Sequence, residues 1–175
     1  ALAGPVVAAA VIFPKDIEIL EVKDSKKLTL SKREELYKKI KNEALAVGIG
    51  KIKVERINKI DNIYKCGLEA MKKAVQALDV KPDHLLVDAR QIPGIDLPQS
   101  KFNKGEEVNF SVAAASIIAK VHRDNLMIEY AKKYPHYGFE SNMGYGTKQH
   151  MDALKEYGVC EIHRRSYKPV AEISL

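Results

Sequence analysis

Apolar residues run almost without interruption over Val6–Phe13, and a proline and an aspartate then break the run. A short apolar run rich in valine and bounded by turn residues predicts a buried β-strand. A second strand is expected over Ala44–Lys53, where small and apolar residues alternate but two glycines weaken the pattern. A third, short strand is predicted at His84–Asp88, before a loop over Arg90–Pro98 that contains two prolines and a glycine.

Helical periodicity or capping signals mark four further segments: Ser31–Glu43, Asn62–Leu78, Ser111–Tyr134 and Lys148–Tyr157. Ser31 and Glu34 have the spacing of a capping box, which predicts the start of the first helix. Thr147 is a suitable N-cap for the last one. Strands alternate with helices, and no repeat or linker divides the chain. The pattern therefore predicts a single α/β domain over residues 1–175.

The composition agrees with an ordinary globular domain, because 46% of the 175 residues are hydrophobic and 30% are charged. No apolar run approaches the roughly 20 residues of a spanning helix, which argues against a membrane protein. Two cysteines, Cys66 and Cys160, do not make a disulfide framework, so a cytoplasmic location is expected. The formal net charge of +6 permits a polyanionic partner such as nucleic acid without requiring one.

Two aspartates are candidates for chemistry. Asp88 ends a predicted strand, where open α/β sheets place ligand groups, although it could simply cap the next turn. Asp124 lies at helical spacing from Ile117 and Val121, so its carboxylate is expected on or beside a buried face. Pairing with Lys120 is the plainer alternative. If the two carboxylates meet, they could bind hard cations, but a two-metal site generally needs more acidic ligands.

Two loops are also candidates. Asp24–Lys27 offers a hydroxyl and ammonium groups that could hold a phosphate, or it is an ordinary solvated lysine pair. Tyr145 lies between two glycines, where an aromatic ring could stack on a base or sugar, or pack inward in a plain turn. Three histidines are interpreted as structural or surface groups: His122, His136 and His150.

Several motifs occur together and in a characteristic order: Leu2–Ala10 (LAGPVVAAA), Asp24–Leu28 (DSKKL), Leu86–Asp88 (LVD), Ala114–Val121 (AASIIAKV) with Arg123–Asp124, Gly144–Thr147 (GYGT) and His163–Arg164. Each motif alone is weakly specific. Their combination closely resembles bacterial ribonuclease HII, the type 2 ribonuclease H, over essentially the whole chain. The resemblance implies a ribonuclease H-like fold, which is a mixed five-stranded sheet flanked by helices.

The same resemblance implies an endonuclease that hydrolyses the RNA strand of RNA–DNA hybrids. It would also cut at ribonucleotides embedded in duplex DNA, leaving 5′-phosphate and 3′-hydroxyl ends, with Mg²⁺ or Mn²⁺ as cofactor. By motif match, Asp88 and Asp124 would be catalytic, metal-binding carboxylates. Ser25 and Lys26 would contact a phosphate of the substrate, and Tyr145 would stack at the RNA–DNA junction. A monomer without a membrane partner is expected.

The chain departs from the family pattern in three places. In the family, a central strand ending in Asp-Glu-Ala-Gly-Arg-Gly precedes the segment that begins here at Leu2, and it supplies two further carboxylates. Without it, the domain is expected to be N-terminally incomplete and inactive or impaired. Ala89 stands where glycine is usual, and Met143 where lysine is frequent. Two alternatives stay open: another metal nuclease or transposase of the same fold, and a non-catalytic nucleic-acid-binding module.

Overall fold

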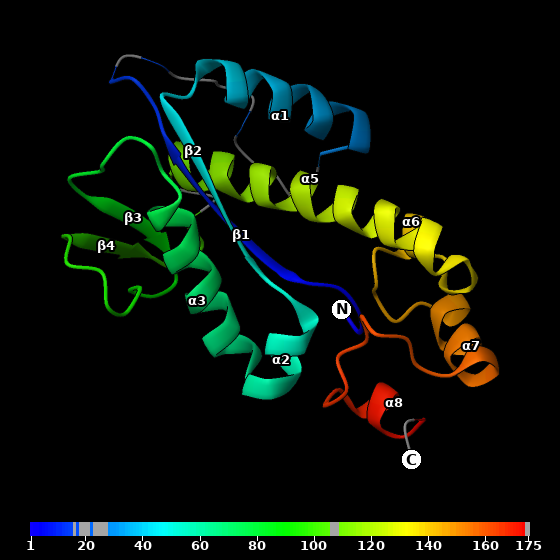
Figure 1. The fold of residues 1–175 in the computed structure, drawn as a ribbon. Helices are drawn as coiled ribbons and strands as arrows, with labels where there is room; N and C mark the ends of the chain where they lie inside the picture. Colours follow the sequence, from blue (N-terminus) through cyan, green and yellow to red (C-terminus); the bar gives the residue numbers. More distant parts are fainter. Residues whose placement is uncertain (16, 18–21, 23–27, 106–108, 174–175) are drawn as a thin grey trace. The chain divides into compact units, whose positions relative to one another are not determined.

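The computed structural model describes residues 1–15, 17, 22, 28–105 and 109–173 (Figure 1). Its elements, in chain order, are β1 (Val6–Ile12), α1 (Leu30–Glu43), β2 (Ala46–Ile52), α2 (Val54–Ile60), α3 (Ile63–Gln76), β3 (Leu85–Asp88), β4 (Gln99–Phe102), α5 (Phe110–Lys133), the 3₁₀ helix η3 (Pro135–Tyr137), α6 (Phe139–Asn142), α7 (Lys148–Tyr157) and α8 (Lys168–Ala171). The three predicted strands and four predicted helices are confirmed, with ends that move by a few residues.

The chain forms two compact units. We call the first the terminal unit; it comprises Ala1–Val6, Ile52–Cys66 and His122–Leu175. The second, the sheet unit, comprises Val7–Lys51 and Gly67–Val121. Helix α5 contributes its first half to the sheet unit and its second half to the terminal unit. The prediction of one domain over the whole chain stays a prediction.

The start of α1 differs from the prediction. Thr29, not Ser31, is the N-cap, and its hydroxyl accepts a hydrogen bond from the backbone N–H of Lys32 at 3.3 Å. Thr29 has the extended backbone that a cap requires, whereas Ser31 already lies inside the helix. Backbone conformation therefore decides which of the two hydroxyl residues caps the helix, and the capping-box spacing does not reveal that conformation.

Five elements escaped the sequence patterns: the short helices η3, α6 and α8, and also α2 and β4. Helix α2 has only seven residues, too few for a helical period to stand out. Strand β4 is the polar segment Gln-Ser-Lys-Phe, without apolar alternation. It exists because it pairs in parallel with β3, with Leu85 opposite Gln99 and Asp88 opposite Phe102.

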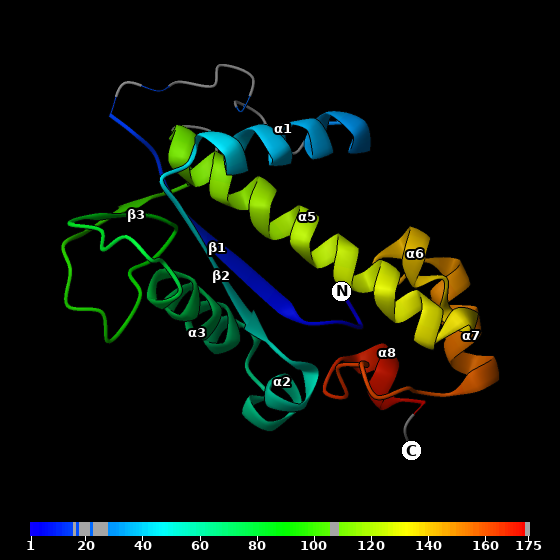
Figure 2. The same cartoon turned by 45° about the horizontal axis from the view of Figure 1, so that its top comes forward.

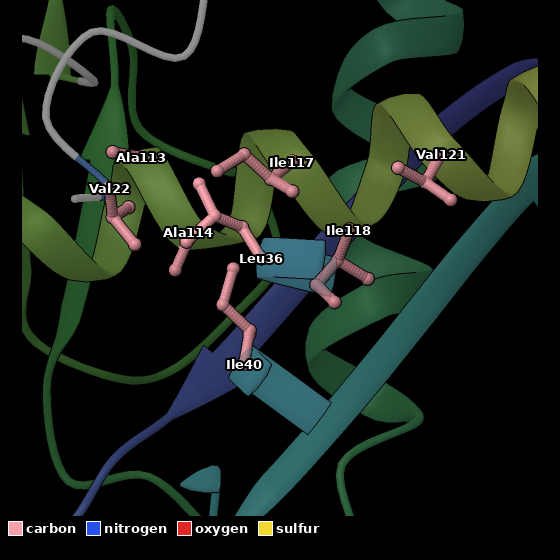
Figure 3. Packing of buried hydrophobic residues seen from close by; sticks show 8 residues of the cluster. All are labelled: Val22, Leu36, Ile40, Ala113, Ala114, Ile117, Ile118 and Val121. Carbon is pink, nitrogen blue, oxygen red and sulfur yellow. The ribbon is translucent and has the colours of Figure 1, made fainter. Parts of the chain in front are cut away.

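In the sheet unit, helices cover both sides of β1 and β2 (Figure 2). On one side, α1 and the first half of α5 enclose a hydrophobic cluster (Figure 3): Val22, Leu36, Ile40, Ala113, Ala114, Ile117, Ile118 and Val121. Val47 and Ile49 of β2 pack against this cluster. The intervening residues, Gly48 and Gly50, face α3. The alternation of β2 therefore separates two packing layers.

The glycines of β2 allow α3 to approach the strand closely. A Cβ atom at Gly48 would overlap the carbonyl oxygen of Ala74, and one at Gly50 would overlap that of Ala70. Both obstacles are backbone atoms of a helix, which cannot move aside as a flexible side chain can. The residues that weaken the strand pattern in the sequence are thus the ones that the helix–sheet packing requires.

The strands form two separate pairs, β1 with β2 and β3 with β4. Within the sheet unit, a cavity of about 440 Å³ lies between β1 and β3. Its lining comes from residues 7–13 of β1 and its end, residues 84–88 around β3, and apolar side chains of α3 and α5 such as Met71, Val75 and Val112. Each pair of strands thus has one strand at this cavity, whose lining is mostly apolar.

Within the described ranges, no helix has the length and apolar character needed to cross a membrane. Among the residues that the structure describes, neither Cys66 nor Cys160 forms a disulfide bond.

We predict that replacing Gly50 by alanine lowers the free energy of unfolding by about 2 kcal/mol, because the new methyl group must displace the backbone of α3. The matched control is Gly67→Ala in α3, where an added Cβ meets no atom within 4 Å. That substitution should raise stability by roughly 0.5–1 kcal/mol, as glycine is a poor helix former. Urea titration measures both changes. Equal effects of the two variants would contradict the packing argument.

Candidate active site

Asp88 is the last residue of β3, at the position that the sequence predicts, and it is half-buried. Its Oδ1 accepts a hydrogen bond from the backbone N–H of Gly105 at 2.8 Å. Its Oδ2 has no hydrogen bond to any residue that the structure describes. One oxygen thus anchors the carboxylate, and the other is left to take a ligand.

The chain turns sharply after Asp88. Ala89 has a φ of 66°, in the left-handed region that favours glycine. Its backbone N–H still donates to the carbonyl oxygen of Phe102 at 2.8 Å, which continues the β3–β4 pairing by one residue. Glycine is the residue usual here in the family that the motifs resemble, and this conformation explains the preference. Alanine adopts it at the cost of backbone strain.

Asp124 lies on α5 with 8% of its surface exposed, as its helical spacing predicts. It follows Arg123, with which it interacts electrostatically. Asp88 belongs to the sheet unit and Asp124 to the terminal unit, so their meeting at one metal site stays a prediction. The described part of the chain contains no group of three or more histidine, cysteine, aspartate or glutamate side chains that could hold a metal ion.

In the terminal unit, Arg123 and Arg164 bind the segment Leu2–Pro5 through its carbonyl oxygens. Arg123 donates from Nε to Pro5 at 3.2 Å and from Nη2 to Ala3 at 3.1 Å. Arg164, which is 5% exposed, donates from Nε to Gly4 at 3.0 Å and from Nη2 to Pro5 at 3.2 Å. Neither guanidinium is paired with a carboxylate among the residues described. The carbonyl dipoles therefore offset the cost of burying these charges.

The loop around Tyr145 is attached to the same segment. The carbonyl oxygen of Gly144 accepts from the N–H groups of Leu2 at 2.7 Å and Ala3 at 3.2 Å. Gly144 has a φ of 78°, and a Cβ there would meet the carbonyl oxygen of Ala3. Glycine at this position thus permits both the turn and the close approach.

Tyr145 itself is 51% exposed, so its ring is accessible, as the stacking hypothesis requires. The guanidinium of Arg123 lies over the ring, with Cζ 5.6 Å from the ring centroid. Arg123 also donates from Nη1 to the carbonyl oxygen of Met143 at 3.0 Å. One arginine therefore supports the loop backbone and the aromatic ring together.

A buried pair of histidines lies behind this loop. His150 and His163 are both fully buried, and their Nε2 atoms are 3.0 Å apart. Burial lowers the pKa of His150, and it lowers the pKa of His163 to about 4. The prediction that His150 is structural agrees with this position. Sequence reasoning noted His163 and Arg164 only as a motif, since two adjacent polar residues give no sign of burial.

Two further predicted residues, Ser25 and Lys26, lie outside the described residues. Of the histidines assigned to structural or surface roles, His136 is exposed and stacks on Tyr157, with ring centroids 4.4 Å apart. The site residues that the structure brings together are thus Tyr145 and the two arginines that the sequence analysis did not single out.

We expect Arg164→Lys to lower the free energy of unfolding by about 2 kcal/mol, because a lysine cannot reproduce the planar fork and leaves a buried carbonyl unsatisfied. Arg165→Lys is the matched control. Arg165 is exposed, and the hydrogen bond it makes to Asn58 comes from its backbone. The control should change stability by less than about 0.5 kcal/mol. Chemical denaturation measures the free energy of unfolding of both variants. An Arg164→Lys protein as stable as the parent would refute the argument.

We further predict that stability falls as the pH drops from about 6.5 toward 4. Burial places the pKa of both histidines below the ordinary value of 6.5, so the unfolded chain binds more protons than the folded chain in this range. Acid therefore favours unfolding. Urea midpoints measured at pH 7, 6 and 5 test this for the parent and for His136→Gln, which keeps the buried pair and should follow the same trend. A midpoint that stays constant over this range would contradict it.

Comparison with known proteins places the chain in a family. The family model for Ribonuclease HII matches residues 1–170. Ribonuclease HII from Lactobacillus acidophilus is 55% identical over 171 residues, which cover 98% of this chain and 68% of the relative. Ribonuclease HII from Bacillus velezensis is 55% identical over 169 residues, covering 97% of this chain and 66% of the relative. The chain thus spans about two thirds of the length of these relatives.

Similar solved structures point to the same family. The ribonuclease H2 from Pyrococcus horikoshii superimposes with a TM-score of 0.82 at 28% identity, covering 98% of this chain and 90% of that one. The RNase HII of Archaeoglobus fulgidus, solved in a complex with PCNA, gives a TM-score of 0.80 at 27% identity, with coverages of 99% and 91%. These matches confirm the ribonuclease H-like fold. The chain belongs to the ribonuclease HII family.

Proposed function

We propose that the protein is a divalent-metal-dependent endonuclease that hydrolyses the RNA strand of RNA–DNA hybrids and cuts at ribonucleotides within duplex DNA. The observation that carries this proposal is the match to ribonuclease HII over residues 1–170. The products would be 5′-phosphate and 3′-hydroxyl ends. The proposal includes a monomer in the cytoplasm; the absence of a disulfide between the two described cysteines accords with that location.

Asp88 and Asp124 would hold the cation, Mg²⁺ or Mn²⁺. Carboxylate oxygens are the ligands that these hard ions prefer, and Asp88 has one oxygen anchored by Gly105 and the other available. Two carboxylates are few for such a site, so water and the substrate phosphate would complete the coordination. A bound divalent cation supplies an activated water molecule and offsets charge on the leaving oxygen.

The cavity between β1 and β3 could hold a further strand that carries additional carboxylates. A strand seated there could pair with the free edges of both strand pairs, and its apolar side chains would meet Val75 and Val112. The family pattern has a strand ending in Asp-Glu-Ala-Gly-Arg-Gly before the segment that starts at Leu2. Because β3 ends in Asp88 at the rim of the same cavity, a strand of this kind could bring its own acidic residues beside Asp88.

Substrate contacts would come from two loops. Tyr145 presents an accessible ring beside Arg123, an arrangement suited to stacking on a base or sugar at the RNA–DNA junction. Ser25 and Lys26 would contact a phosphate of the nucleic acid backbone. The guanidinium group of Arg123 donates to backbone carbonyls, which hold it in place beside the ring of Tyr145.

The test is cleavage of a duplex that contains a single ribonucleotide, with Mn²⁺, by this chain and by the chain extended with the Asp-Glu-Ala-Gly-Arg-Gly strand. We expect the extended chain to cleave, and Asp88→Asn or Asp124→Asn to lower its rate by at least about a thousandfold, since each removes a metal ligand. Controls are the exposed residues Asp96 and Asp152, one in each unit. Their Asn variants should keep the parent rate. Full activity of Asp88→Asn would refute the assignment.

The scarcity of metal-binding groups among the described residues favours one other candidate, a non-catalytic nucleic-acid-binding module. That function predicts salt-sensitive binding of hybrid duplex, unaffected by Asp88→Asn or Asp124→Asn, and no cleavage even by the extended chain. Another nuclease or transposase of the same fold would instead cut all-DNA duplex and ignore the ribose. The same assay with an all-DNA substrate separates these outcomes.

A further inference from the structure

A continuous line of hydrogen bonds connects the segment before His163 with the loop that carries Tyr145. The backbone N–H of Cys160 donates to Nδ1 of His163 at 2.9 Å. Nε2 of His163 is 3.0 Å from Nε2 of His150, and Nδ1 of His150 is 2.9 Å from the carbonyl oxygen of Tyr145. All these atoms belong to the terminal unit.

The two ends of this line determine where every proton lies. An amide N–H can only donate, so Nδ1 of His163 is unprotonated and its neutral ring carries the proton on Nε2. A carbonyl oxygen can only accept, so His150 carries its proton on Nδ1 and accepts on Nε2. The line therefore runs in one direction, from the amide of Cys160 to the carbonyl of Tyr145. If either ring took up a further proton, two N–H groups would face each other, either between the two Nε2 atoms or between Nδ1 of His163 and the amide of Cys160.

Aromatic rings hold the pair in place. The ring of Phe139 meets His150 edge-on at 5.2 Å between centroids, and Tyr137 meets His163 at 5.0 Å. The titratable groups near the pair are the phenol of Tyr137, whose ring meets His163, and the amino group of Ala1; Cys160 contacts His163 through its backbone N–H. None of them is a carboxylate that would stabilise a charged imidazole, and both rings are fully buried. Their orientations are therefore rigid, as positioning requires.

The end of the line is the peptide that orients Tyr145. The N–H of Tyr145 donates to the carbonyl oxygen of Asn142 at 2.8 Å, and its own carbonyl also accepts from the N–H of Thr147 at 2.9 Å. The bond from His150 joins the carbonyl of Tyr145 to a fully buried side chain, and the buried side chain of Asn142 accepts from the N–H of the preceding Gly144 at 2.8 Å. Glycines flank Tyr145 on both sides, so the conformation of this turn depends on the hydrogen bonds that hold it.

We propose that His150 and His163 are positioning residues that fix the peptide of Tyr145 and thereby direct its ring toward the nucleic acid. This inference rests on the proposed function for its consequence in cleavage. The positioning of the Tyr145 peptide is inferred from the hydrogen bonds alone and does not depend on that function.

Two substitutions of His150 separate the two ends of its ring. His150→Asn places an amide NH₂ near the position of Nδ1, so it keeps the bond to Tyr145 and loses His163. His150→Gln places its amide near the position of Nε2, so it keeps His163 and loses Tyr145. Both leave a polar amide in the same buried space. A role in stability alone therefore predicts similar behaviour of the two variants.

The first readout needs no activity. The chain contains no tryptophan, so Tyr145→Trp introduces a single indole into the loop. In that background we expect His150→Gln to speed the decay of indole fluorescence anisotropy, because the carbonyl of residue 145 loses the hydrogen bond from His150. His150→Asn should leave the decay unchanged. Equal decay in both variants, whether fast or slow, would overturn the proposal.

The second readout is a double-mutant cycle in the cleavage assay, run on the extended chain at a temperature where all variants are folded. We expect His150→Gln to lower kcat/KM about tenfold, the worth of one hydrogen bond, and to cause no further loss once Tyr145 is alanine. Additive losses would refute action through Tyr145. If the parent cleaves nothing, the proposed function fails, while the anisotropy measurement still decides the positioning role.

Discussion

The terminal unit depends on two guanidinium groups, one half-buried and one buried, whose charges are stabilised by peptide carbonyls. Arg123 and Arg164 together hold the carbonyl oxygens of Ala3, Gly4 and Pro5, and Pro5 accepts from both. A buried charge without such donors and acceptors in place would cost several kcal/mol, so the arginines and the segment stabilise each other or neither is stable. The Tyr145 loop is attached to this arrangement through Gly144. The accessible ring of Tyr145 thus rests on a rigid base.

The sheet unit depends on a different constraint, the close approach of α3 to β2. Gly48 and Gly50 are the positions where any side chain would overlap the helix backbone. On the other face of the same strand, Val47 and Ile49 join the cluster formed by α1 and α5. The layers are therefore determined by residue size as well as by polarity. The same unit carries Asp88, whose carboxylate is aimed by one backbone N–H and a left-handed turn at Ala89.

Much of the fold could be predicted from local pattern, and the misses have physical causes. Long periodic or apolar segments such as α5 and β1 were predicted because burial leaves a repeating signature. Strand β4 was missed because its pairing with β3, not its own sequence, makes it a strand. The N-cap of α1 was misplaced because Thr29 and Ser31 offer the same chemistry, and the backbone at Thr29 decides between them.

Motif and spacing along the chain were enough to indicate the family, the elements with clear periodicity and the candidate residues Asp88, Asp124 and Tyr145. The folded chain was needed to show that Arg123 and Arg164 bind backbone carbonyls. It was also needed to show that His150 and His163 form one line of hydrogen bonds that ends at Tyr145. These groups act on partners up to 160 positions away in the chain. No local pattern encodes such partners, because the folding of the whole unit brings them together.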